Sequence, residues 1–415
     1  MKKLLVLGGA NVHCKLVEAA KEMGIYTIVT DYLRSSESKM IADESHMVNI
    51  TDIDGLVQLC KDKSVSAVLS THLDPCQRPY QTLCQSLDFF CYGDKDQFFK
   101  MTDKHAFKQM CKENGVDVIP EYTIEDVLKD NVEYPLFIKP VDSRGSRGQT
   151  VCWKKEEALS AISFAEKESS NGDILIEKYL NNVQEVQITY FFINGKPYLI
   201  RTVDSYNGKE EEHLEKIVAC SISPSQYTEE YLATAHENVV KMFRNMGFHD
   251  GPIFMQGFYD NGRFRFFDPG LRFPGVDYDR VYRTEYGIDL MKMMVSYALN
   301  GKMPINELPK DMYNLRGKRA AVLFPVIRAG VIADIKGVDV VRSDKRVFSY
   351  LQRHTVTGEV GWTYNVNQRF AEIDILASDT EDLKEAITSI QNSLSVRDTR
   401  NEEMLYEHFD VNRIV

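Results

Sequence analysis

The first ninety residues alternate short apolar runs with amphipathic segments, and this alternation limits the possible folds more than any other feature. The runs at 4–7, 26–30 and 65–70 are strand-length and rich in aliphatic or β-branched residues. Between them, 12–23 and 53–61 place their apolar residues near one face of a helix. Short buried strands separated by helices predict a parallel sheet covered on both faces. Ligands of such sheets bind at the carboxyl ends of the strands.

The pattern changes after about residue 94, where antiparallel and mixed structure is expected. Asn194-Gly195 and Asn261-Gly262 each separate two strand-like runs, and Asn-Gly is a strong signal for a β-hairpin. The other expected elements are a helix from Thr102-Asp103 to Asn114-Gly115, a strand at 135–140, a Gly/Ser loop at 143–148, a helix at 156–168 and a strand at 174–177.

A polar, proline-containing stretch at 301–310 predicts a domain boundary. After it we expect short strands at 320–326, 356–360 and 370–376 and a helix after Thr380. The predicted fold class is therefore α/β and α+β. It comprises a parallel N-terminal α/β domain at 1–95, a central domain at 96–305 and a small mixed domain at 306–415.

Composition narrows the range of partners. The chain has 415 residues and a net charge of −11, which argues against a broad nucleic-acid-binding surface. No apolar run approaches the roughly 18 residues of a membrane span. The first run ends at Gly8-Gly9, so we interpret it as a buried strand rather than a signal peptide. The eight cysteines have no metal-site spacing, which favours reduced structural thiols in a cytoplasmic protein.

Two features of the N-terminal third remain open. Gly8-Gly9 follows a strand and Asp31 ends the next one, as in dinucleotide-binding folds. The third glycine of that fingerprint is missing, so a tight turn is the favoured interpretation and an NAD(P)-dependent oxidoreductase is an alternative. His72 and Asp74 follow a buried strand at the expected ligand edge, where a structural role is favoured over a functional one.

A second set of motifs has several parts in one order. Lysines can neutralise phosphate oxygens, and a Gly/Ser loop can direct backbone N–H groups toward phosphates. A strand-end segment can offer backbone groups to an adenine edge, a carboxylate can accept ribose hydroxyls, and hairpin oxygens can hold Mg²⁺. Together the parts predict a nucleoside triphosphate site. They are Thr102-Asp103-Lys104, Lys139, the loop at 143–148, Glu177-Lys178-Tyr179-Leu180, Glu185, Gln256 and Asp268-Pro269-Gly270-Leu271-Arg272.

This order of motifs resembles the ATP-grasp superfamily of ligases, which includes biotin carboxylase, carbamoyl-phosphate synthase and L-amino-acid ligases. The resemblance implies that residues 96–305 form an ATP-grasp domain with a lid at about 132–180, and that ATP and Mg²⁺ are the cofactors. It also implies a role for each motif. Lys104 and Lys139 would contact ATP phosphates, Gly145, Ser146 and Gly148 would close over them, Glu177, Lys178, Tyr179 and Leu180 would adjoin adenine, Glu185 would hold the ribose, and Arg272, with Lys139, would act in catalysis on the transferred phosphoryl group.

The metal positions implied by the resemblance differ from the usual pattern. Gln256 and Asp268 stand where most relatives have Glu, and Gly270 stands where they have Asn. Glutamine still offers a carbonyl oxygen, but one negative charge is absent. We therefore expect Mg²⁺ to be bound by Asp268 and Gln256, with ATP and substrate supplying further ligands.

The resemblance implies an ATP-dependent ligase that joins a small-molecule carboxylate to an amine or similar nucleophile. The reaction would pass through an acyl phosphate and release ADP and phosphate. Three alternatives remain: a bicarbonate-activating enzyme similar to carboxylases and carbamoyl-phosphate synthase, a degenerate nucleotide-binding protein without catalysis, and the oxidoreductase. No nucleic acid or membrane partner is expected, and a homodimer is compatible with this interpretation.

Overall fold

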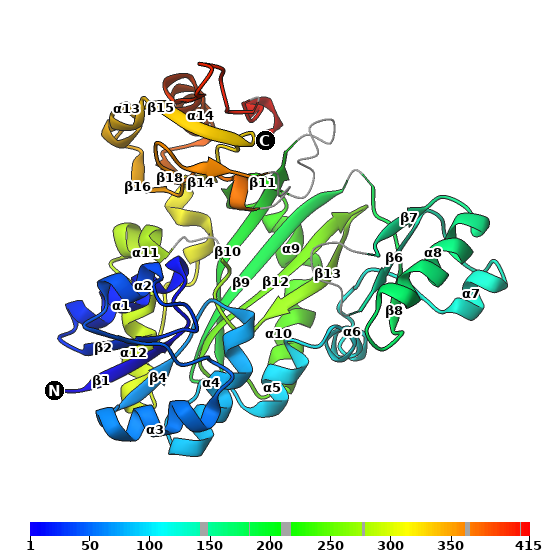
Figure 1. The fold of residues 1–415 in the computed structure, drawn as a ribbon. Helices are drawn as coiled ribbons and strands as arrows, with labels where there is room; N and C mark the ends of the chain where they lie inside the picture. The colour runs from blue at the N-terminus through cyan, green and yellow to red at the C-terminus, as the bar shows by residue number, and fades with distance from the viewer. Residues whose placement is uncertain (142–147, 182, 209–216, 276–278, 362–365, 407) are drawn as a thin grey trace.

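The computed structural model describes residues 1–141, 148–181, 183–208, 217–275, 279–361, 366–406 and 408–415. In this part of the chain the strands form four sheets (Figure 1). Gly145 and Ser146, two of the predicted phosphate-binding residues, lie outside the described residues.

The N-terminal sheet is parallel, as the alternating pattern predicts. Its strands β1 (Lys3–Leu7), β2 (Tyr26–Thr30), β3 (Glu44–His46) and β4 (Ala67–Leu69) are ordered β3-β2-β1-β4. The apolar helix α12 (Leu290–Asn300), from much later in the chain, packs against α1 and β4. The other helices are η1 (Asn11–His13), α1 (Cys14–Glu22), α2 (Glu37–Ile41), α3 (Ile53–Lys63), α4 (Asp74–Leu87) and α5 (Lys95–Lys100).

The lid forms its own small layer beyond α6 (Lys104–Glu113). Strands β5 (Glu121–Tyr122), β8 (Ile174–Lys178), β6 (Leu136–Pro140) and β7 (Thr150–Cys152) form an antiparallel sheet in that order. Helices α7 (Ile124–Leu128) and α8 (Lys155–Glu168) cover it and share a separate hydrophobic cluster with its strands. The lid boundaries at 132–180 stay a prediction, since β5 and α7 of this layer precede them.

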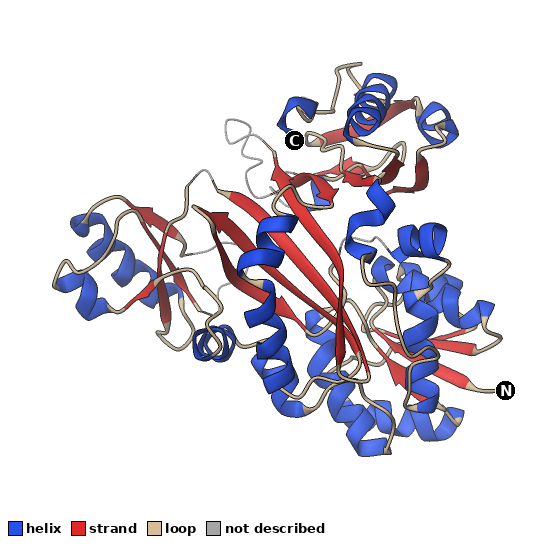
Figure 2. Cartoon of the chain, turned by 180° about the vertical axis from the view of Figure 1, so that it is seen from behind, coloured by secondary structure: helices blue, strands red, loops and turns tan. Residues whose placement is uncertain are grey.

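The central sheet has eight strands in the order β13-β12-β9-β10-β11-β14-β18-β16. Both predicted hairpins are confirmed, with positive φ at Asn194, Gly195, Asn261 and Gly262, as tight two-residue turns require. Helices α9 and α10 lie along one face (Figure 2), where Tyr231 packs with Tyr190 of β9. The elements are β9 (Gln184–Ile193), β10 (Lys196–Asn207), β11 (Val218–Ser223), α9 (Thr228–Thr234), α10 (His236–Asn245), β12 (Gly251–Asp260), β13 (Arg263–Gly270) and α11 (Asp279–Tyr286).

The C-terminal region extends this same sheet. β14 (Arg319–Leu323) pairs with β11, and β18 (Ala371–Ala377) and β16 (Val347–Gln352) follow it. A second sheet contains β17 (Glu359–Val360), β15 (Gly330–Lys336) and β19 (Ser395–Asp398). The boundary near 305 stays a prediction. The helices are η3 (Met312–Gly317), α13 (Val338–Ser343), η4 (Val366–Gln368), α14 (Thr380–Ser393) and η5 (Val411–Arg413).

Within the described residues, no helix is both long and apolar enough to cross a membrane.

Candidate functional site

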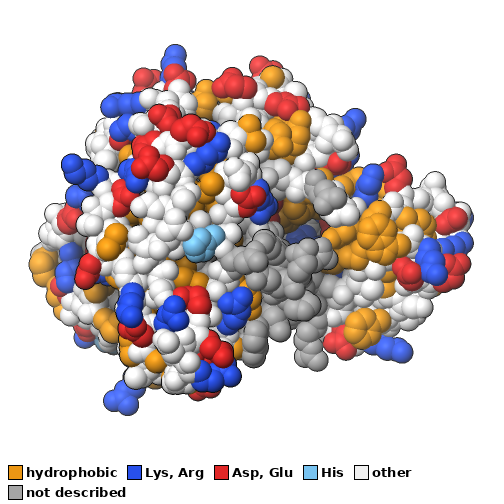
Figure 3. Space-filling model, turned by 90° about the horizontal axis from the view of Figure 1, so that it is seen from above, with side chains coloured by type: hydrophobic (Ala, Val, Ile, Leu, Met, Phe, Trp, Pro, Cys, Tyr) orange, Lys and Arg blue, Asp and Glu red, His pale blue; other side chains and the backbone are white. Residues whose placement is uncertain are grey.

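The predicted site residues come from elements that converge between the lid and the central sheet. The molecular surface is hollowed beside the lid (Figure 3). Lys139 lies on β6 and Glu177 on β8 of the lid sheet, whereas Gln256 and Asp268 lie directly opposite each other on β12 and β13. Lys104 is the first residue of α6, which leads from the N-terminal region toward the lid.

Glu177 is the ionic centre of the lid side. Its side chain is 3% exposed, and its carboxylate accepts from Lys108 Nζ and, at 2.8 Å, from Lys139 Nζ. Burial alone would raise the pKa of Glu177, but the charges of Lys139 and Lys108 outweigh it and hold the pKa below its usual value. The two lysines therefore keep Glu177 ionised.

The other predicted residues of the lid side have contacts of their own. Lys139 Nζ also lies 5.0 Å from the centroid of the Phe137 ring. Lys178 pairs with Glu133, the Tyr179 N–H donates to the Pro135 carbonyl at 2.8 Å, and Leu180 follows β8 half-buried. Gly148 has a φ of +72°, and an added Cβ would lie 2.7 Å from Pro140. The end of the predicted loop therefore requires glycine.

On the hairpin side, the pKa of Asp268 is raised, in contrast to that of Glu177. Burial and the neighbouring charge of Asp74 raise the pKa of Asp268, while Arg272, Lys104 and Lys139 act to lower it. Lys104, Lys139 and Arg272 are thus near enough to Asp268 for their charges to act on it. The sequence motifs from three regions meet at this carboxylate.

Glu185, predicted to hold the ribose, lies on β9 next to the hairpin. The Gln256 amide nitrogen is 3.5 Å from Glu185 Oε1. Burial and the charge of Asp268 raise the pKa of Glu185 to about 7, against the lowering effects of a hydrogen bond from Asn207 and the charge of Arg369. Glu185 therefore adjoins the predicted metal residues in this structure.

Gly270 has a steric reason to lack a side chain. A Cβ there would lie 2.2 Å from the Phe254 ring, which faces Gly270 across the hairpin. The Arg272 guanidinium lies 4.5 Å from the centroid of the same ring. Phe254 thus occupies the space of a third side-chain ligand and supports Arg272.

Arg272 also joins the hairpin to the N-terminal sheet. Its guanidinium forms a two-pronged ion pair with Asp74, at the start of α4, and donates to the Phe273 carbonyl at 3.0 Å. Nearby, the Tyr92 hydroxyl donates to the carbonyls of Ser70 and Leu271 at 2.9 and 3.1 Å. Asp74, for which a structural role was the favoured interpretation, is therefore a direct partner of the predicted catalytic arginine.

The carboxyl edge of the N-terminal sheet is closely packed. The Gly9 N–H donates to Asp31 Oδ2 at 2.8 Å, and a Cβ on Gly9 would lie 1.9 Å from Ser36 Oγ. Burial lowers the pKa of His13 to about 4, so this side chain is neutral near pH 7. His72, also buried, stacks on Phe273.

The donor set of the hairpin suits a hard cation. Among the described residues, no three His, Cys, Asp or Glu side chains gather as a metal site. Gln256 and Asp268 nevertheless offer paired oxygens next to Glu185, and Mg²⁺ commonly relies on one or two protein oxygens plus substrate phosphates and water. These residues fit Mg²⁺ held together with a nucleotide.

Sequence reasoning missed two residues of this site. Lys108 lies four residues after Lys104 on α6, and this helical spacing is the only signal that could have identified it. Asn207 ends β10 beside Glu185 and has no distinguishing sequence pattern.

Comparison with known families gives a match over the centre of the chain. Residues 103–268 match the sequence model of the carbamoyl-phosphate synthase L chain, ATP binding domain. The chain is 23% identical over 332 residues to the 2-oxoglutarate carboxylase small subunit of Hydrogenobacter thermophilus, covering 73% of this chain and 67% of that one. It is 28% identical to the human mitochondrial propionyl-CoA carboxylase alpha chain over 211 residues, 45% of this chain but only 29% of that protein.

Solved structures share the fold over nearly the whole chain. Phosphoribosylglycinamide synthetase from Anaerococcus prevotii has a TM-score of 0.78 at 16% identity, with 96% of this chain and 100% of that chain covered. L-amino acid ligase from Bacillus licheniformis has 0.75 at 16% identity, with 96% and 99% covered. The biotin carboxylase domain dimer of H. thermophilus 2-oxoglutarate carboxylase, in complex with MgADP and bicarbonate, has 0.74 at 18% identity, with 97% and 91% covered.

Proposed function

We propose that the chain is an ATP-dependent ligase of the ATP-grasp superfamily that joins a small-molecule carboxylate to an amine or similar nucleophile. ATP would phosphorylate the carboxylate to an acyl phosphate and leave as ADP. The nucleophile would then displace phosphate. Positioning and charge neutralisation are sufficient for such phosphoryl transfer, so no protein nucleophile is required.

The observation that carries this proposal is the meeting of three cations at one hairpin carboxylate. The charges of Lys104, Lys139 and Arg272 all act on Asp268. A group of cations around a desolvated hairpin carboxylate suits a polyphosphate that arrives with its metal ion. The lid sheet and the hairpin thus provide the two sides of an ATP site.

Each residue would have a distinct task. Lys139 and Lys104 would neutralise phosphate oxygens, and Arg272, oriented by Asp74, would hold the transferred phosphoryl group. Glu177-Lys178-Tyr179-Leu180 would adjoin the adenine, and Gly145, Ser146 and Gly148 would close over the phosphates. Bound at Gln256 and Asp268, Mg²⁺ would supply charge stabilisation of the phosphate oxygens.

Glu185 would bind the ribose of ATP, and its contact with Gln256 would also support the metal-binding side chains. Replacing Glu185 by Gln would keep the hydrogen-bonding shape while removing the charge. A selective loss of affinity for ATP over a ribose-free triphosphate would support the ribose role, and an equal loss for both would contradict it.

A screen of product formation tests the proposed function. The purified protein is incubated with MgATP and pairs of carboxylic acids and amines, and ADP release and product mass are measured. ADP release that needs both an acid and an amine, with an amide product, is the expected result. MgATP binding without turnover for any pair would favour the degenerate nucleotide-binding alternative.

Bicarbonate activation is the second candidate. It is favoured by the similarity to the 2-oxoglutarate carboxylase small subunit and to the biotin carboxylase domain solved with bicarbonate. ADP release that depends on bicarbonate and not on an organic acid would identify it.

We also propose a cytoplasmic location and a homodimer. All eight cysteines are free, which suits a reducing compartment. A related biotin carboxylase domain is a dimer. Light scattering of the purified protein would test the assembly.

A further inference from the structure

The lid sheet has an apolar face and a charged face. Ile138 and Ile176 lie opposite each other and pack with α8 in the hydrophobic cluster of the lid. One position along the same strands, Glu177 lies opposite both Glu121 and Phe137. Because side chains alternate between the two faces of a sheet, this second row lies on the face away from α8. Glu121 and Glu177 are therefore neighbouring carboxylates on that face.

Lys108 of α6 contacts both of these carboxylates. Its Nζ donates to Glu177 Oε1 and lies 3.4 Å from Glu121 Oε2. The side chains of Lys108 and Glu177 are each 3% exposed, so their ion pair is shielded from solvent. Helix α6 itself packs against β13, the strand that carries Asp268. Lys108 thus links the charged face of the lid to the hairpin side of the site.

Lys139 is held by the other oxygen of Glu177. Its Nζ donates to Glu177 Oε2 at 2.8 Å. The Lys139 side chain is 19% exposed, whereas that of Lys108 is almost completely enclosed. A group that meets an incoming phosphate needs an exposed surface, and of the two lysines on Glu177 it is Lys139 that has one.

The arrival of ATP would affect the two lysines differently. In the proposed function Lys139 neutralises a phosphate oxygen, so its charge is then shared between the phosphate and Glu177. A buried carboxylate that loses its cation is costly. Lys108 stays on Oε1, and Glu177 therefore keeps a counterion while Lys139 interacts with the phosphate.

We propose that Lys108 is a positioning residue of the ATP site, which compensates the charge of Glu177 and so leaves Lys139 available to the phosphates of ATP. The inference rests on the proposed function and adds a residue to it. Lys108 acts through Glu177 and does not touch the nucleotide. Without Lys108, Lys139 would be the remaining lysine on a buried carboxylate and would be held there more strongly.

The affinity for an unreactive ATP analogue with Mg²⁺, measured by calorimetric titration, tests this inference. Lys108→Met removes the ammonium group and keeps an unbranched side chain, and the dissociation constant should rise by about tenfold or more. Lys108→Arg keeps the charge and should restore most of the affinity. Lys112→Met, at an exposed position of the same helix, is the matched control and should leave the affinity within about twofold of that of the unmodified protein.

A double-mutant cycle shows whether Lys108 acts through Glu177. In the Glu177→Gln background no carboxylate holds Lys139, so adding Lys108→Met should change the dissociation constant by less than about twofold. Removing both buried charges together is better tolerated than removing one, so this comparison remains available if Lys108→Met alone does not fold. A further tenfold loss in the Glu177→Gln background would overturn the proposal, because Lys108 would then act without Glu177.

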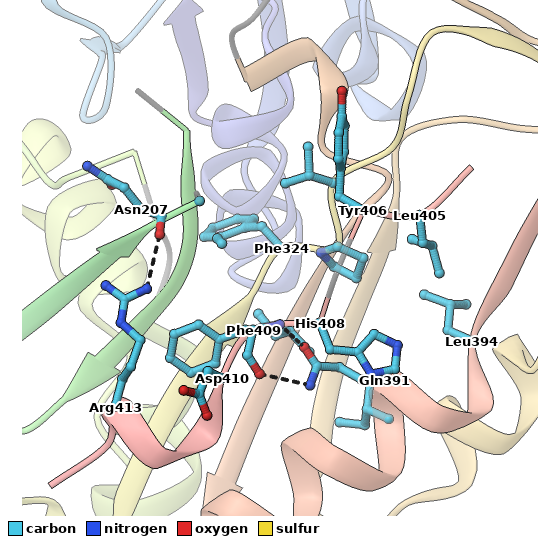
Figure 4. Close-up of a pocket in the computed structure, with 16 residues that line it drawn as sticks. Asn207, Phe324, Gln391, Leu394, Leu405, Tyr406, His408, Phe409, Asp410 and Arg413 are labelled. Atoms are coloured by element: carbon cyan, nitrogen blue, oxygen red, sulfur yellow. Dashed lines mark hydrogen bonds between the residues drawn. The ribbon is translucent and has the colours of Figure 1, made fainter. Parts of the chain in front are cut away.

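Gln391 provides a control for lost stability alone. It lines a cavity of about 180 Å³ between the central sheet and the C-terminal segment (Figure 4). Its amide donates to the Phe409 carbonyl at 3.2 Å and accepts from the Phe409 N–H at 2.7 Å. Gln391→Met breaks both hydrogen bonds, so it should lower the midpoint of urea unfolding but keep the affinity for the ATP analogue within about twofold. A loss of affinity equal to that in Lys108→Met would overturn the proposal, because lost stability would then explain both.

The remaining outcomes separate this inference from the proposed function. Unchanged affinity in a folded Lys108→Met variant would overturn the role of Lys108 and leave the proposed function in place. Equal losses in Lys108→Arg and Lys108→Met would also overturn that role, since the charge would not be the property that matters. Absence of binding of the ATP analogue by the unmodified protein would contradict the proposed function itself.

Discussion

Two carboxylates on opposite sides of the proposed ATP site differ in how the protein compensates their charge. Glu177 on the lid accepts hydrogen bonds from two lysines, and its pKa is lowered. Asp268 on the hairpin is desolvated next to Asp74, and its pKa is raised in spite of three surrounding cations. The lid carboxylate is satisfied within the protein, whereas the hairpin carboxylate is not.

This difference distinguishes a carboxylate that stabilises the fold from one that is suited to binding a cation. A carboxylate whose partners are all in the chain stabilises the fold, and removing it leaves buried cations uncompensated. A carboxylate whose charge is unfavourable in the free protein suits a site that gains a cation on binding. We therefore expect the two residues to respond to substitution in opposite ways.

The largest expected effect is on stability, from Glu177→Gln. It should lower the free energy of unfolding by about 3 kcal/mol, because Lys108 and Lys139 lose their buried counterion. Urea unfolding measures this loss. Glu133→Gln removes an exposed partner of Lys178 and is the matched control, with an expected change within about 0.5 kcal/mol. If Glu133→Gln lowers the free energy of unfolding as much as Glu177→Gln does, Glu177 has no special role in stability.

The same variant has a pH signature. A lowered pKa means that Glu177 stabilises the fold above its usual value of 4.5, and that this stabilisation is lost as the pH falls below it. The stability difference between the unmodified protein and Glu177→Gln should therefore shrink as the pH falls from 4.5 through the lowered pKa of Glu177.

Next in size is Asp268→Asn, which should reduce Mg²⁺-dependent turnover by about 100-fold, or about 2.7 kcal/mol in the barrier. Its melting temperature should be equal or higher, because an unfavourable buried charge is removed. On the same hairpin Asp260 pairs with Arg265 at 2.8 Å, so Asp260→Asn should lose stability and keep turnover. Full activity in Asp268→Asn would contradict the metal assignment.

Lys139→Ala removes the cation that pairs with Glu177 on the lid and whose charge acts on Asp268 on the hairpin. Loss of a charge-assisted contact should weaken an unreactive ATP analogue by about 2 kcal/mol, or roughly 30-fold. Calorimetric titration measures it, and Lys155→Ala, near the start of the lid helix α8, is the control. An unchanged dissociation constant would remove Lys139 from the site.

The smallest expected effect comes from Gln256→Glu, which adds a negative charge on the hairpin, opposite Asp268. Mg²⁺ affinity in the presence of nucleotide should rise by about tenfold. The metal-free protein should become less stable, because the new carboxylate would face Glu185. If Mg²⁺ titration finds no gain, Gln256 does not contact the metal.

Local patterns predicted most of the fold. The parallel N-terminal strands follow from their short apolar runs, and the Asn-Gly turns fixed the hairpin that sets Gln256 opposite Asp268. The sequence pattern does not predict α4, because Pro79 lies inside it and proline normally ends a helix. The strand expected at 356–360 is reduced to Glu359–Val360.

Contacts between distant segments could not be predicted from local patterns. The partner of Arg272 is Asp74, 198 residues earlier in the chain. The second lysine on Glu177 is Lys108, whose spacing from Lys104 does not reveal a partner 69 residues later in the chain. Such pairings depend on how sheets and helices pack, and neither hydrophobic periodicity nor turn chemistry encodes that packing.

The continuity of the central sheet has a consequence for cutting the chain. β11 pairs with β14, from Cys220 opposite Leu323 to Ser223 opposite Ala320. The C-terminal strands therefore cover an edge that would otherwise be open. A chain truncated near residue 305 would leave unpaired those backbone N–H and C=O groups of β11 that face β14, while the pairing with β10 would remain. Exposed edge strands recruit other strands, so the truncated protein should aggregate on expression even though its ATP-site motifs remain intact.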